Sequence, residues 1–102
     1  MQATYTILIY RDPNEPEGWL GHVPAVAAAH SFGDTREHAI AMVTEALEVV
    51  LEFFAERGSS FPPDNFDIQI ELEAITDLLG AAPLDLEKVQ VRVYHEVIAV
   101  AA

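Results

Sequence analysis

The sequence contains no cysteine and only five lysine or arginine residues, against 17 aspartate and glutamate residues. Without cysteine, neither a disulfide framework nor a thiolate metal site can form, and the chain is compatible with a reducing compartment. The formal net charge is −12. The basic residues are scattered along the chain, at Arg11, Arg36, Arg57, Lys88 and Arg92. Because a duplex-binding domain normally gathers such residues into one patch, we expect no direct nucleic-acid binding.

Long hydrophobic runs are also missing. No apolar run reaches the roughly 20 residues of a membrane-spanning helix, since glutamates interrupt the longest one. The segment MQATYTILIYRD has no basic residue ahead of its apolar stretch, so it does not resemble a signal peptide. We therefore expect a cytoplasmic protein with no membrane contact. A hydrophobic fraction of 51% over 102 residues predicts one ordered domain, residues 1–102.

Three short segments near the N-terminus carry strand patterns. In residues 3–10, Tyr5, Ile7 and Ile9 fall on one face of a strand, and the residues between them fall on the other face. Residues 19–23 form a second candidate strand before Pro24, and the alanine-rich residues 26–32 form a weaker third. Together the three segments predict an antiparallel meander.

A long helix is predicted over residues 35–57. Asp34 is a natural N-cap with Glu37 at the capping-box spacing, while Gly58 and then Pro62-Pro63 end the helix. The Gly-Asp-Thr triplet at the start is no phosphate loop, because it has one glycine, no lysine and an acid where the anion would sit. We interpret it as a structural helix start, made of Gly33, Asp34, Thr35 and Glu37.

This helix is apolar over roughly 200° of its circumference, where a surface helix needs little more than 100°. A polar stripe, called here the glutamate stripe, contains Glu45, Glu48, Glu52 and Glu56. The helix is expected to lie on a sheet that contributes Tyr5, Ile7, Ile9, Ile68 and Ile70. Its residues that face this sheet are expected to be Val43, Leu47, Val50 and Phe54. That leaves Met42, Val49 and Phe53 as an apolar row beside the stripe. With Val97 and Val100, which lie in a doubly apolar segment, this row predicts an oligomer or partner interface, and thus a homo-oligomer (a dimer or tetramer).

Residues 65–102 are predicted to form a two-strand extension with no recognisable DNA-binding motif. Residues 66–75 alternate apolar with acidic or amide side chains and predict one strand. Residues 76–86 form a connection with one helical turn, and residues 87–100 a long final strand. The expected fold class is α+β, with a three-stranded antiparallel meander, one long helix packed on the sheet, and further strands.

No arrangement of residues predicts catalysis, and we expect no enzyme, no catalytic residue, no cofactor and no metal site. The four histidines lack the i, i+4 spacing of a helical metal site. His22 and His30 could still meet across neighbouring strands, and the turn with Asp12, Glu15 and Glu17 could hold an ion weakly. A metal-dependent hydrolase built from these groups remains an alternative hypothesis.

Several motifs follow one another in a set order along residues 1–64. They are Tyr5 in the first strand, Gly18-Trp19 after an acidic turn, Val23-Pro24, Gly33-Asp34-Thr35, and Pro62-Pro63 after the long helix. In this order and spacing they resemble the HicB-type antitoxin family. The resemblance implies a HicB-like, partial ribonuclease H-like fold, in which a helix crosses a three-stranded meander and a fourth strand lies parallel to the first.

The resemblance also implies a function within a toxin–antitoxin system. It implies an acidic, non-enzymatic antitoxin that binds and blocks a small basic toxin, an mRNA ribonuclease, and that forms dimers or tetramers. Many members of the family add a C-terminal DNA-binding motif, which residues 66–102 lack. The alternative is a stand-alone, self-associating domain without a toxin that binds a small ligand between subunits. A gene for a small basic protein beside this one would favour the antitoxin.

Overall fold

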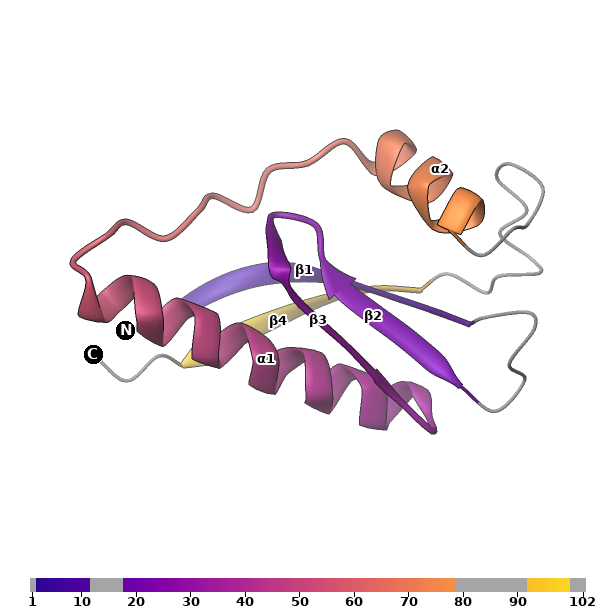
Figure 1. Ribbon diagram of the computed structural model, residues 1–102, viewed down its shortest axis with the longest axis horizontal. Coiled ribbons are helices and arrows are strands. Elements are labelled where there is room, and N and C mark those ends of the chain that lie inside the picture. Colours follow the sequence, from indigo (N-terminus) through magenta and orange to yellow (C-terminus); the bar gives the residue numbers. More distant parts are fainter. Residues whose placement is uncertain (1, 12–17, 79–91, 100–102) are drawn as a thin grey trace.

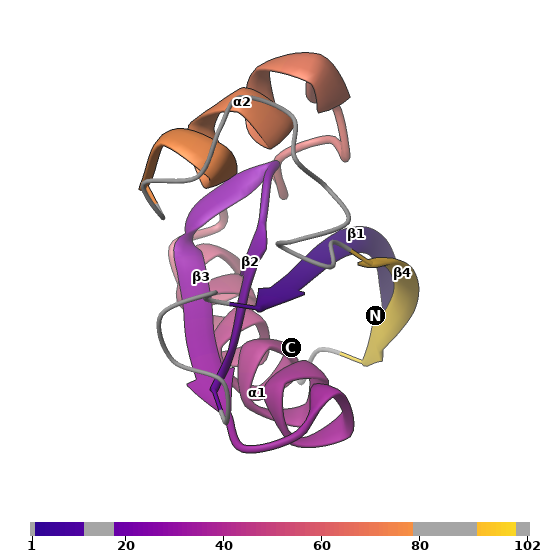
Figure 2. The same ribbon diagram turned by 90° about the vertical axis from the view of Figure 1, so that its right-hand side faces the viewer.

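The computed structural model describes residues 2–11, 18–78 and 92–99 (Figure 1). Its elements in chain order are β1 (Gln2–Arg11), β2 (Trp19–Val23), β3 (Val26–Gly33), α1 (Arg36–Glu56), α2 (Ile68–Leu78) and β4 (Arg92–Ala99). The strands form one sheet in the order β3-β2-β1-β4. Figure 2 shows three layers, with α1 on one face of the sheet and α2 over the other. The α+β class and the meander are confirmed.

The fourth strand runs antiparallel to β1, so the parallel pairing that the resemblance implied is wrong. Gln2 pairs with Ala99, and Ile9 pairs with Arg92. The reason lies in the path of the chain after α1. Residues 59–67 pass the N-terminal half of β1, and α2 then carries the chain toward the other end of the strand, beside Tyr10. β4 begins opposite Ile9, near that end, and runs back along β1 to a position opposite Gln2.

The main core lies between α1 and the sheet. Tyr5, Ile7 and Ile9 on β1 point into it, as the alternation predicted, and all three are buried. The buried row of α1 consists of Ala39, Val43, Leu47 and Leu51. Residues four apart lie above one another on a helix, so this row forms a straight inner face. Val43 and Leu47 were predicted to face the sheet and do so, whereas Val50 and Phe54 are only partly buried beside the core.

The helix start differs from the prediction by one residue. Thr35, not Asp34, is the N-cap, with extended backbone angles (φ −127°, ψ 166°). The hydroxyl of Thr35 accepts a hydrogen bond from the backbone N–H of His38 at 3.0 Å, and the His38 ring accepts one from the backbone N–H of Asp34 at 3.2 Å. His38 therefore stands where a capping box has its glutamate, and the predicted Asp34–Glu37 box is wrong.

Both glycines that flank α1 have a physical reason to be glycine. A Cβ on Gly33 would lie 2.5 Å from the backbone nitrogen of Ala39, so the end of β3 approaches the first turn of α1 too closely for a side chain. Gly58 has φ of +68°, the left-handed conformation typical of a helix C-terminus. The predicted helix end at this glycine is confirmed.

The strand predicted over residues 66–75 is wrong, because Ile68–Leu78 form helix α2. The Asp67 carboxylate accepts hydrogen bonds from the backbone N–H groups of Gln69 and Ile70, which caps the helix. Ile68 and Ile70, expected in the core, are 43% and 63% exposed. A period-two pattern of four apolar residues is too short to exclude a helix when an N-cap precedes it.

The segment between the helices, residues 59–67, covers part of the edge of β1. β2 pairs with Leu8–Arg11, so among the described strands none lies beside the first half of that edge. There the Tyr5 hydroxyl donates to the carbonyl oxygen of Pro62, and the Asp64 carboxylate accepts from the backbone N–H and the hydroxyl of Thr6 at 3.1 and 2.8 Å. Burial, and secondly the Asp64 charge, raise the pKa of Tyr5.

The final strand, predicted over 87–100, is present as β4 over Arg92–Ala99. Val100, the acidic turn at 12–17 and the remainder of the predicted final strand lie outside the described residues, as does the side chain of Val97. Among the helices that the structure describes, none has the length and hydrophobicity to cross a bilayer.

Candidate interaction surface and ligand pocket

The apolar row of α1 lies at the surface of the molecule. Val49 is 62% exposed and Phe53 51% exposed, and Met42 is partly buried. Beside the row a groove of about 400 Å³ runs between α1 and β3, lined by Ala28, Ser31, Met42, Glu45, Ala46, Val49 and Val50. The structure therefore brings Met42 and Val49 together in one groove and leaves more than half of the Val49 and Phe53 side chains exposed. Its role as an interface stays a prediction.

The groove follows an outer strand of the sheet. Within the described residues β3 has β2 as its one neighbouring strand, so backbone groups on its other side are open to a further strand. Apolar side chains from α1 thus adjoin hydrogen-bonding groups from β3. A surface of this kind suits a protein partner better than a small solute.

The charges around the groove have one sign. Glu45 lines it, and the rest of the glutamate stripe continues along α1. Two of the basic residues lie against Trp19, with the guanidinium carbons of Arg11 and Arg36 5.5 and 5.7 Å from its ring centroid. The guanidinium of Arg57 lies 4.6 Å from the ring centroid of Phe53. Two of these cations thus share the Trp19 ring, and the third lies against Phe53 in the apolar row.

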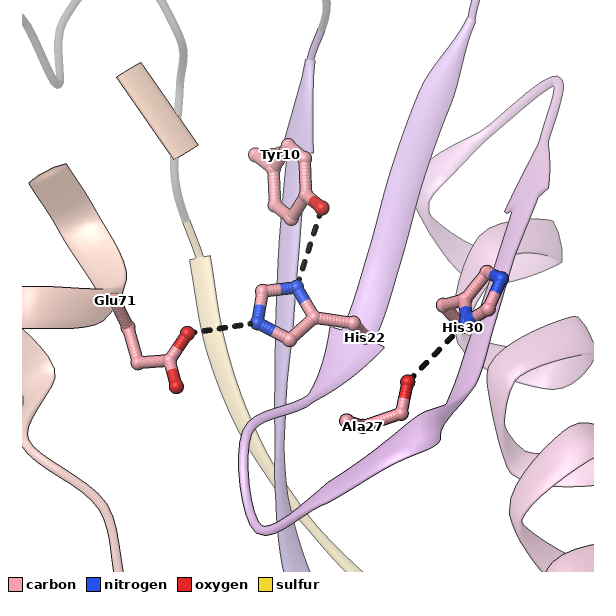
Figure 3. A network of polar contacts seen from close by, with 5 residues as sticks. All are labelled: Tyr10, His22, Ala27, His30 and Glu71. Atoms are coloured by element: carbon pink, nitrogen blue, oxygen red, sulfur yellow. Dashed lines mark hydrogen bonds and ion pairs between the residues drawn. The ribbon is translucent and has the colours of Figure 1, made fainter. Parts of the chain in front are cut away.

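On the opposite face, three polar side chains from β1, β2 and α2 form a chain of hydrogen bonds (Figure 3). The Tyr10 hydroxyl lies 3.2 Å from Nδ1 of His22, and Nε2 of His22 lies 3.2 Å from the Glu71 carboxylate. A carboxylate can only accept, so Nε2 carries the proton and Nδ1 accepts from the tyrosine. Burial, and secondly the Glu71 charge, raise the pKa of Tyr10 to about 12.

This chain of hydrogen bonds forms the polar end of a second pocket, of about 380 Å³, between α2 and the sheet. Its apolar lining includes Leu20, Pro24, Ala27, Ala74, Ile75 and Leu78. Ile75 is buried against Leu8 and Tyr10, and this small second core packs α2 onto the sheet. The sequence analysis missed the pocket, because Glu71 was placed on the solvated face of a strand. The sequence signal for this helix is Asp67, an N-cap residue that directly precedes residues 68–78.

His22 and His30 occupy directly paired positions on β2 and β3, as the sequence analysis allowed. Their rings have different partners, since Nδ1 of His30 lies 3.3 Å from the carbonyl oxygen of Ala27 (Figure 3). Within residues 2–11, 18–78 and 92–99, no group of three or more histidine, aspartate or glutamate side chains is placed to hold a metal ion.

Solved structures share this arrangement of sheet and helices. One chain, from a toxin–antitoxin complex of Streptococcus pneumoniae, is 19% identical, with 97% of this chain and 70% of that chain covered and a TM-score of 0.72. The N-terminal domain of the Burkholderia pseudomallei antitoxin HicB is 19% identical, with 98% and 100% covered and a TM-score of 0.58. A chain of the HicA3 and HicB3 toxin–antitoxin complex is 17% identical, with 98% and 100% covered and a TM-score of 0.53. No protein-family model and no curated protein matches the sequence.

At 17 to 19% identity these likenesses establish the fold. The chain is an α+β domain of the kind found in toxin–antitoxin complexes. More narrowly, it has the fold of the N-terminal domain of the antitoxin HicB. The HicB-like fold inferred from the motifs is confirmed, with α2 and the antiparallel β4 as corrections to the detail.

Proposed function

We propose that this chain is a non-enzymatic, HicB-like antitoxin that sequesters a small basic toxin by direct protein contact. What supports this is the combination of a fold shared with chains of toxin–antitoxin complexes and a formal net charge of −12. Such a charge speeds encounter with a basic protein and disfavours contact with nucleic acid. By the resemblance, the toxin is an mRNA ribonuclease, and the encounter takes place in the cytoplasm.

The contact surface that we assign to the toxin includes the glutamate stripe of α1. The test begins with a search of the neighbouring genes for a small basic protein, which is then titrated against the purified chain at several salt concentrations. Because attraction between exposed charges is screened by salt, the affinity should fall as salt rises. Glu52→Lys should weaken the complex, whereas Glu73→Lys, the same charge change on α2, should have little effect. Lack of a complex, or equal effects of the two variants, would count against the proposal.

We also propose a homo-oligomer, most simply a two-fold dimer, through the apolar row of Met42, Val49 and Phe53. The exposure of Val49 and Phe53 supports it, since an uncovered apolar row beside an open strand edge is unusual in a monomer. Two chains of charge −12 repel each other, so this assembly should tighten as salt rises, opposite to toxin binding.

Sedimentation velocity tests the dimer with a matched pair of variants. Val49→Asp places a charge in the apolar row and should give a monomer. Ala41→Asp places the same charge at an exposed position one turn before Glu45, beside the glutamate stripe, and should leave the assembly intact. A wild-type monomer at micromolar concentration in moderate salt would refute the dimer. The alternative function, self-association without a toxin, keeps the dimer but predicts no complex with the neighbouring basic protein.

A further inference from the structure

The pocket under α2 has the properties of a small-molecule site. Its volume of about 380 Å³ lies in the lower part of the range of about 300–1,000 Å³ that ligand sites occupy. Most of its lining is apolar, and the polar side chains of Tyr10, His22 and Glu71 lie at one end.

The hydrogen bonds already made decide which head group fits. Nε2–H of His22 donates to one carboxylate oxygen of Glu71, and the Tyr10 hydroxyl donates to Nδ1 of His22. What remains is acceptor capacity, namely the second oxygen of Glu71 and the lone pairs of the Tyr10 oxygen. In its neutral form His30 adds a third acceptor at the rim, because a ring whose Nδ1 donates to the carbonyl oxygen of Ala27 keeps a lone pair on Nε2.

The charge of the lining points the same way. Among the described residues that line the pocket, Glu71 carries a carboxylate and none is lysine or arginine, in a chain whose formal net charge is −12. An anion would meet acceptors and a negative field, whereas a protonated amine donates up to three hydrogen bonds and compensates the carboxylate. Ser31, the one hydroxyl besides Tyr10 in the lining, can serve either kind of head group and does not change the balance.

We propose that this pocket binds a small primary amine with an apolar body. The ammonium group contacts Glu71 and the Tyr10 oxygen, and the body lies against Leu20, Ile75 and Leu78. A ligand held in this way joins α2 to the sheet, where Ile75 and the Glu71–His22 contact now fix the helix. The inference stands apart from toxin binding, since it uses the opposite face of the sheet from α1.

The experiment is a titration of the isotope-labelled protein with 2-phenylethylamine, followed by amide chemical shifts. We expect saturable shifts at Leu20, Ala74 and Leu78, with a dissociation constant below about 1 mM, which corresponds to about 4 kcal/mol. 3-Phenylpropionate, which has a similar body and a carboxylate head, should bind at least tenfold more weakly. The neutral 2-phenylethanol should fall between the two.

Matched variants identify the site. Glu71→Gln removes the charge but keeps an oxygen that accepts from His22, so the fold is retained while the amine affinity falls at least tenfold. Glu73→Gln removes the same charge from an exposed residue of the same helix whose carboxylate accepts only from Gln69, and should leave the affinity unchanged. Ala74→Leu fills the pocket from α2 and should weaken all three probes. Equal affinity for amine and carboxylate, no effect of Glu71→Gln, or shifts confined to the α1–β3 groove would overturn the proposal.

Discussion

Replacing Tyr10 by phenylalanine should change how the stability of the protein depends on pH. Tyr10 is 5% exposed, and its hydroxyl is bonded to His22. Losing one such hydrogen bond costs about 1 kcal/mol. Below about pH 9, where tyrosine is neutral in both the folded and the unfolded protein, we therefore expect the variant to be less stable than the wild type by about this amount.

At higher pH the order should reverse. The pKa of Tyr10 is raised from 10.0 to about 12 on folding, so between these values the unfolded chain has lost the proton that the folded chain retains. The stability conferred by neutral Tyr10 is thus complete below pH 10 and is lost as the pH rises toward 12. Two units correspond to about 2.7 kcal/mol in total, of which about 1.4 kcal/mol is lost by pH 11. Since this loss of stability exceeds the contribution of the hydrogen bond, the stability curves of the wild type and the variant should cross near pH 11.

Urea unfolding followed by circular dichroism, at several pH values from 8 to 11, measures the difference in unfolding free energy between the two proteins. The raised pKa of Tyr5 acts on both and cancels in the difference. A constant difference across this range would show that Tyr10 ionises with equal ease in both states, and would refute the buried position assigned to it.

Four further substitutions test the fold. Thr35→Ala should lower the free energy of unfolding by about 1 kcal/mol, because the hydrogen bond from the backbone N–H of His38 to the cap is lost. Asp34→Ala should lower it far less. Thermal unfolding of the two variants measures the order, and the reverse order would contradict the assignment of Thr35 as the cap. Gly33→Ala should cost about 1–3 kcal/mol, because its Cβ would collide with backbone atoms of α1, and wild-type stability in urea would disprove that close approach. Leu47→Ala, at a fully buried position, should cost about 3 kcal/mol; a loss under about 1 kcal/mol would place Leu47 outside the core.

The sequence predicted those elements whose patterns are long or are bounded by strong signals. β1 shows clear alternation, and α1 shows more than five turns of helical periodicity that end at Gly58. The N-cap was misplaced by one residue, because Asp34 and Thr35 are both good caps and only the backbone conformation distinguishes them. α2 was mistaken for a strand over a window of ten residues, where four alternating apolar side chains outweighed the cap at Asp67.

The pocket could not be predicted from sequence spacing. Tyr10, His22 and Glu71 are brought together by the register between β1 and β2 and by the position of α2 on the sheet. Neither follows from local patterns. The resemblance implied a parallel β4, and the sequence did not predict a helix over residues 68–78. The apolar row, by contrast, follows from helical geometry alone, and the structure leaves it at the surface.

The position of β1 in the sheet has a consequence for the synthesis of the protein. Among the described elements β1 comes first in the chain. One of its edges pairs with β2 and is completed by Asp64, and the other pairs with β4, which places Ala99 opposite Gln2. Contacts so distant in sequence form late in folding. Until β4 has been made, the edge of β1 that pairs with it has no partner, and an unpaired strand edge beside apolar layers is prone to aggregation or degradation.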